Sequence, residues 1–148
     1  SKIVFIAESR SIGDDNHNNS LMGEARQLFG KILSAINLSC EDVYISNILK
    51  YIPSKNADSH QLDVTICESH LHQQLQIINP TLIVALGEDV GNKMLDVDES
   101  IESLNGRIHK FDDFNLMVTY HPEAILKNPK LKQPTWEDYK KIRENYLN

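Results

Sequence analysis

The chain has 148 residues, 41% of them hydrophobic and 24% charged, which fits a single domain over residues 1–148 with one hydrophobic core. The 15 basic and 21 acidic residues give a formal net charge of −6 at pH 7. This balance argues against a strong non-specific nucleic-acid binder, because such proteins neutralise phosphates with clustered Lys and Arg. No apolar run is long enough to span a membrane, and two cysteines cannot form a disulfide framework. We therefore expect a cytoplasmic protein without a membrane partner. We also expect a monomer, although no feature of the sequence determines the oligomeric state.

Short apolar runs alternate with segments of helical periodicity along the chain. Four runs have the continuous apolar character of buried parallel strands, at residues 2–7, 43–48, 82–86 and 115–120. Four other segments carry apolar residues at helical spacing, at residues 21–36, 59–78, 88–95 and 134–146. The alternation predicts a three-layer α/β/α domain with a central, mostly parallel four-stranded sheet.

The carboxyl ends of parallel strands form the usual ligand site of such folds. The residues that end or follow the predicted strands should therefore surround one site, and they are Glu8, Asn47, Gly87 and His121. Gly87 allows a close approach of the backbone to a ligand, but the acidic Glu88 and Asp89 after it weaken a phosphate-binding interpretation. The remaining histidines show no metal-binding spacing, so no metal site is predicted.

Three of these side chains have candidate chemistry, each with a simpler alternative. The Asn47 side chain can pair with both the N–H and the carbonyl on the edge of uracil. Cytosine presents the opposite pattern and would leave polar groups unpaired. The simpler alternative is that Asn47 caps a turn. His121, held at a strand end before Pro122, can donate a hydrogen bond to a leaving-group oxygen; the alternative is a partly exposed loop histidine. Glu8 can orient water or stabilise a cationic sugar, although acidic loop residues are also common without any such role.

Several phrases, in order along nearly the whole chain, resemble the iron–sulfur-type (family 4) branch of the uracil-DNA glycosylase superfamily. The place of the family's first motif is occupied by AESRSIGDD, and its second catalytic motif is matched by TYHPEAILKNP. Further family phrases are matched by SLMGEARQLF, VYISNILK, INPTLIVALG, LNGRIH and WEDYKKI. The resemblance implies a uracil-DNA glycosylase fold in which two catalytic loops, at residues 7–15 and 120–127, face each other.

The resemblance also implies an activity, the excision of uracil from DNA by base flipping and hydrolysis of the N-glycosidic bond. Asn47 would bind the uracil edge, and His121 would stabilise the departing uracil anion. Glu8 would position water, and Ser9 and Leu21 would lie beside the base. The residues expected to contact DNA are Gly87, Ile125, Leu126, Lys127 and Lys130.

The sequence departs from the family pattern at the substrate pocket and at the cluster ligands. Arg10 and Ser11 replace a Pro-Gly pair, and Leu21 replaces a phenylalanine that stacks on uracil, where stacking is worth about 1–3 kcal/mol per base. Tyr51 stands in place of one cluster cysteine, and only Cys67 occupies an expected ligand position. Because one thiolate cannot hold an iron–sulfur cluster, we predict that no cofactor is bound.

Two alternatives to an active uracil-DNA glycosylase follow from these departures. The first is a non-catalytic protein of this fold that binds replication or repair proteins, by analogy with the psi subunit of the bacterial clamp loader. The acidic net charge and the residues Arg10, Ser11 and Leu21 favour it. The second is a glycosylase for another damaged base, because the pocket at Leu21 is altered. An enzyme should bind uracil or abasic DNA, whereas an adaptor should bind a protein and ignore both.

Overall fold

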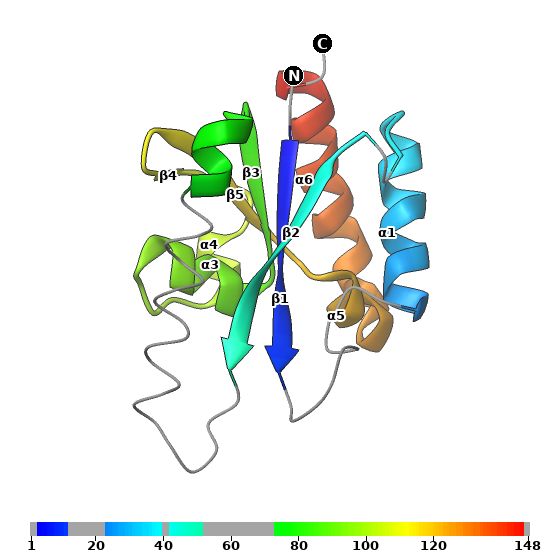
Figure 1. Cartoon of the computed structure of the whole chain (residues 1–148). Coiled ribbons are helices and arrows are strands. Elements are labelled where there is room, and N and C mark those ends of the chain that lie inside the picture. Colours follow the sequence, from blue (N-terminus) through cyan, green and yellow to red (C-terminus); the bar gives the residue numbers. More distant parts are fainter. Residues whose placement is uncertain (1–2, 12–22, 40–41, 52–72, 147–148) are drawn as a thin grey trace.

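A computed structural model describes residues 3–11, 23–39, 42–51 and 73–146 (Figure 1). For residues 8–11 and 46–51 it describes the backbone only. Within these ranges a central sheet lies between two helical layers. This arrangement confirms the predicted three-layer α/β/α fold.

The sheet has five strands in the order β2-β1-β3-β5-β4. Its first four members are parallel to one another: β2 (Tyr44–Tyr51), β1 (Ile3–Ser11), β3 (Leu82–Leu86) and β5 (Phe114–Thr119). The fifth strand, β4 (Ile108–Phe111), pairs with β5 in antiparallel fashion through a tight turn at Asp112, where φ is 53°. β4 was not predicted because it is only four residues long and none of them is fully buried. A short edge strand of this kind lacks the apolar run that identifies the others.

The helices cover both faces of the sheet (Figure 1). One layer holds α1 (Gly23–Ala35) and α6 (Lys132–Tyr146), whose Phe29 and Tyr139 pack on Phe5. The other layer holds the helical residues 73–78, α3 (Glu88–Leu95) and α4 (Ile101–Leu104). Each helical layer forms a hydrophobic core with one face of the sheet. Alternate residues of each inner strand pack into these two cores, because successive strand side chains point to opposite faces. The predicted helix at 59–78 lies partly outside the described residues.

Two segments near the carboxyl ends of the strands differ from the prediction. Strand β1 continues to Ser11, so Glu8 and Ser9 lie in the strand and not in a loop. The predicted loop at 120–127 contains the helix α5 (Pro122–Lys127), which is followed by a 3₁₀ turn at Pro129–Leu131. Proline at the first position of α5 is compatible with helix initiation, since its missing N–H has no partner there in any helix.

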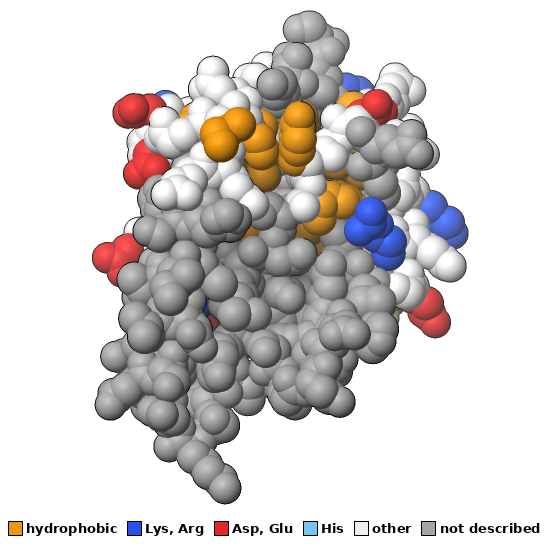
Figure 2. Space-filling view, viewed as in Figure 1, with side chains coloured by type: hydrophobic (Ala, Val, Ile, Leu, Met, Phe, Trp, Pro, Cys, Tyr) orange, Lys and Arg blue, Asp and Glu red, His pale blue; other side chains and the backbone are white. Residues whose placement is uncertain are grey.

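Exposed apolar side chains gather at the opposite, amino end of β2. Tyr44 is 46% exposed and Ile77 is 83% exposed. Together with Ile45 and Ile78 they line a shallow groove of about 270 Å³, and Figure 2 shows hydrophobic side chains on the upper part of this face. Because Tyr44 is the first residue of β2, the groove is not part of the edge where a ligand of this fold would bind.

In the described part of the chain, no helix is long and apolar enough to cross a membrane.

Candidate active site

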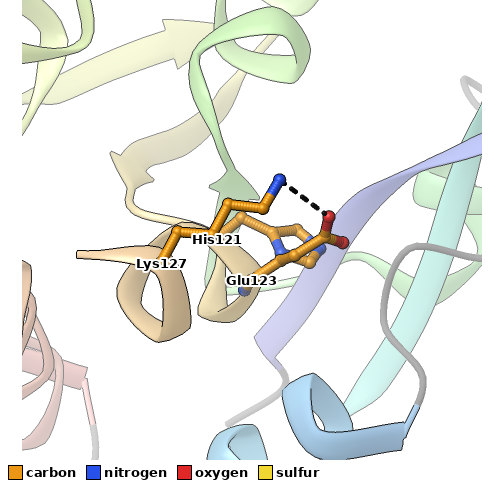
Figure 3. Close-up of polar contacts among 3 residues, drawn as sticks. All are labelled: His121, Glu123 and Lys127. Carbon is orange, nitrogen blue, oxygen red and sulfur yellow. Dashed lines mark hydrogen bonds and ion pairs between the residues drawn. The ribbon is translucent and has the colours of Figure 1, made fainter. Parts of the chain in front are cut away.

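His121 is held in a defined orientation at the end of β5 and the start of α5 (Figure 3). It is the N-cap residue of α5, and its Nδ1 atom accepts a hydrogen bond of 2.9 Å from the backbone N–H of Glu123. In a neutral imidazole, an acceptor at Nδ1 leaves the ring proton on Nε2. The backbone of α5 thus selects the tautomer in which Nε2–H is a hydrogen-bond donor.

Gly87 lies beside His121 at the end of the neighbouring strand β3. Its backbone N–H donates a hydrogen bond of 2.8 Å to the carbonyl of Thr119, which joins the ends of β3 and β5. Its φ of 109° is rarely adopted by residues with a side chain, so glycine is required by the backbone conformation. A Cβ atom at Gly87 would lie 3.7 Å from the Cβ of His121, which is ordinary contact distance. The two residues are therefore direct neighbours in the site.

Glu8, Ser9 and Asn47 come from the two strands at the other side of β3. In the register of β1 and β2, Ala7 is opposite Asn47 and Glu8 is opposite Ile48. Glu8 and Asn47 are thus on adjacent strands and one residue apart in the register. The side chains of these three residues, and the whole of Leu21, lie outside the described part of the structure.

The four residues expected to contact DNA near His121 differ in their exposure. Ile125 is only 1% exposed and packs into the interior, so its burial does not favour direct contact with DNA. Leu126 beside it is 42% exposed. Lys127 lies one turn after Glu123 on α5 and forms an exposed ion pair with it at 3.6 Å (Figure 3). Lys130 is exposed in the 3₁₀ turn that follows.

A buried polar network at the end of β5 was not predicted. Asp138 of α6 is 2% exposed, and its Oδ2 atom accepts hydrogen bonds of 2.6 Å from Thr119 Oγ1 and of 2.6 Å from Asn105 Nδ2. Burial raises the pKa of Asp138 above its ordinary value, although both hydrogen bonds act in the opposite direction. One signal for this network was available in the sequence, since polar residues occupy the helical spacing of the buried face of α6. The buried residues of α6 are Thr135, Asp138, Tyr139 and Ile142.

Comparisons with known proteins identify the family of the chain. Residues 1–141 match the family model described as the uracil DNA glycosylase superfamily. The chain is 33% identical to the type-4 uracil-DNA glycosylase of Sulfurisphaera tokodaii over 152 residues, which cover 97% of this chain and 69% of that protein. The chain belongs to the type-4 branch of the uracil-DNA glycosylase superfamily. It is also similar to type-4 enzymes of Archaeoglobus fulgidus, at 31% identity with 97% and 76% of the two chains covered, and of Saccharolobus solfataricus, at 30% with 97% and 70% covered.

This membership confirms the resemblance found in the sequence and the predicted class, a DNA-repair enzyme of the uracil-DNA glycosylase family. The cysteines of the chain do not fit an iron–sulfur cluster, because Cys40 and Cys67 are its only two and a cluster requires about four protein ligands. Both lie outside the described ranges, and within those ranges no group of three or more His, Cys, Asp or Glu side chains is placed to hold a metal ion. The absence of a cluster remains a prediction.

Proposed function

We propose that this uracil-DNA glycosylase excises uracil from DNA by flipping the base into a pocket at the carboxyl ends of β1, β2, β3 and β5. The observation that carries the proposal is the hydrogen bond from the Glu123 N–H to His121 Nδ1, at 2.9 Å. It prepares Nε2–H as a fixed donor at the edge of the sheet where the other candidate residues also lie. A donor fixed before the reaction needs no reorganisation when charge develops on the substrate.

The chemical step is hydrolysis of the bond between C1′ of the sugar and N1 of uracil. The bond breaks with its electron pair leaving on the base, and His121 Nε2–H donates a hydrogen bond to the uracil oxygen that gains negative charge. Glu8 positions the water whose oxygen forms the new bond to C1′. One proton of this water ends on the uracil anion, so the products are free uracil and an abasic sugar. The roles proposed for His121 and Glu8 are carried out by their own side chains and do not require a metal or cofactor.

Recognition of the base and of the strand is assigned to different residues. Asn47 pairs with the N–H and carbonyl of the uracil edge, a pattern that cytosine does not present. Ser9 and Leu21 lie beside the base. The remaining contacts are with the DNA backbone and the vacated stack, and we assign them to Gly87, Leu126, Lys127 and Lys130. The expected monomeric state and cytoplasmic location remain predictions.

Base excision from a single-stranded oligonucleotide with one uracil, followed by alkaline cleavage of the strand, tests this function. The wild-type protein, Asn47→Ala and His121→Ala would be purified from a host that lacks its own uracil glycosylase. His109→Ala is a matched control, because His109 bonds to the carbonyl of Leu104 from the edge strand β4 and has no assigned role in the site.

The wild-type protein and His109→Ala should cleave the strand and release free uracil, and both active-site variants should lose at least about 100-fold in rate. A folded wild-type protein that does not cleave would refute the proposal for uracil. Other damaged bases, and replication or repair proteins as binding partners, would then be tested in its place.

A further inference from the structure

The buried carboxylate of Asp138 is joined to the strand that delivers His121. Thr119 is the last residue of β5, and its hydroxyl donates to Asp138 Oδ2 at 2.6 Å. His121 follows two residues later and begins α5. The side chain of Asp138, from helix α6, therefore holds the end of strand β5, which leads to His121.

The carbonyl groups at the end of β5 are also held by partners outside the strand. Asn105 Nδ2 donates to the carbonyl of Val118 at 3.1 Å and to Asp138 Oδ2 at 2.6 Å. The Gly87 N–H donates to the carbonyl of Thr119 at 2.8 Å. At the end of β5, the hydroxyl of Thr119 and the carbonyl groups of Val118 and Thr119 are thus all hydrogen bonded to partners outside the strand. Asp138 accepts from both side-chain donors of the network, the Thr119 hydroxyl and Asn105 Nδ2.

The composition of the network indicates more than a general role in packing. A buried carboxylate is costly unless its oxygens are hydrogen bonded, so an apolar side chain on the buried face of α6 would stabilise the fold more simply. Gly106, whose φ is 78°, lies beside the network: a Cβ atom there would be 3.6 Å from Asp138 Oδ1, and Lys141 Nζ donates to its carbonyl at 3.3 Å. Polar groups from α6, β5 and the turn after α4 thus meet at the end of β5, two residues before His121.

We propose that Asp138 is a positioning residue for base excision, which acts through Thr119 to set the position of His121. The inference rests on the proposed function and deepens it. Asp138 does not contact the reacting atoms, and its effect is on the placement of the His121 ring. Because displacement of a catalytic group by about 1 Å can cost about 100-fold in rate, loss of the Thr119 hydroxyl should lower kcat more than KM.

Two substitutions at Thr119 separate positioning from a purely structural role. Thr119→Val keeps the shape of the side chain but removes the hydroxyl, and Thr119→Ser keeps the hydroxyl. Excision would be measured on the single-stranded uracil oligonucleotide, well below the melting temperature of each variant. Thr119→Val should lower kcat by about 10- to 100-fold with KM within about twofold of wild type, and Thr119→Ser should restore most of kcat.

A readout that does not need activity keeps the inference apart from the proposed function. The ¹⁵N chemical shifts of the His121 ring report which nitrogen carries the proton and how strongly Nδ1 is hydrogen bonded. They should change in Thr119→Val and stay close to wild type in Thr119→Ser. If the wild-type protein does not excise uracil, the proposed function fails while these shifts still test the inference.

Substitutions at Asp138 and at Thr119 together decide the inference. Asp138→Asn retains an oxygen acceptor and should keep kcat within a few-fold of wild type, whereas Asp138→Leu should behave as Thr119→Val does. Wild-type kcat together with unchanged ring shifts in a folded Thr119→Val protein would overturn the inference. So would a loss of activity that Thr119→Ser does not restore.

Discussion

Gly91 of α3 lies so close to Val118 of β5 that a Cβ atom at Gly91 would come within 2.9 Å of both γ-carbons of Val118. Such a contact is too short for real Cβ atoms, so a side chain at this position would force Val118 or the backbone of α3 to shift. The contact is next to Thr119 and therefore close to the end of β5 that precedes His121.

We expect Gly91→Ala to lower the free energy of unfolding by about 1–3 kcal/mol, because overpacking forces side chains or backbone to shift. The measurement is denaturant unfolding. Gly30→Ala is the matched control, since Gly30 lies within α1 and a Cβ there would meet nothing within 4 Å. That substitution should stabilise the protein by about 0.5–1 kcal/mol. Equal stability of Gly91→Ala and the wild type would contradict the close packing.

The hydroxyl of Tyr139 is buried and has no hydrogen-bond partner in the part of the chain that the structure describes. Its ring stacks on Phe5 with a centroid distance of 6.2 Å. We expect Tyr139→Phe to leave the free energy of unfolding unchanged or to raise it by about 1 kcal/mol, because the ring is kept and an unpaired polar group is removed. Tyr139→Ala, which removes the ring as well, should cost about 3–5 kcal/mol. A loss above about 1 kcal/mol in Tyr139→Phe, measured by denaturant unfolding, would show that the hydroxyl has a partner.

Stability should depend on pH through Asp138. Burial raises the pKa of this carboxyl above its ordinary value of 3.8, so the folded protein holds the proton more tightly than the unfolded chain does. This contribution to stability is fully present below pH 3.8 and is lost as the pH rises through the raised pKa of the folded state. Asp138→Asn should remove this loss of stability with rising pH.

The test is the free energy of unfolding as a function of pH for the wild type and Asp138→Asn. Their difference should change in favour of Asp138→Asn as the pH rises above 3.8. Asp98→Asn, at an exposed position, makes the same change in net charge and serves as the control. A difference that is constant with pH would be contrary to the prediction.

Lys127 and Lys130 should contribute to DNA affinity through charge alone. Substitution of either by alanine should raise KM and lower the slope of log affinity against log salt concentration by about 1, because one fewer phosphate is neutralised. Excision at several salt concentrations measures both. Lys110→Ala, on the edge strand β4, should leave the slope unchanged. An unchanged slope in both Lys127→Ala and Lys130→Ala would remove them from the DNA interface.

The local pattern of the sequence determined the fold class and the edge of the sheet at which Gly87 and His121 lie. Continuous apolar runs identified β1, β2, β3 and β5, since buried parallel strands leave no polar face, and the carboxyl-end rule brought Gly87 and His121 together as the structure has them. The roles of Asn47 and Glu8, suggested by their chemistry and by the family resemblance, stay predictions because their side chains lie outside the described part of the structure.

Other features depend on contacts between residues far apart in the sequence, and only the tertiary structure decided them. β4 forms because β5 offers an edge to pair with, and its own side chains show no apolar run. Ile125 and Leu126 are neighbours with similar side chains, but packing of α5 buries the first and exposes the second. Helical spacing places Asp138 on the buried face of α6, but only the packed structure shows that its partner is the hydroxyl of Thr119, 19 positions earlier. Hydrogen-bond partners and burial are properties of the packed chain, so a linear pattern cannot specify them.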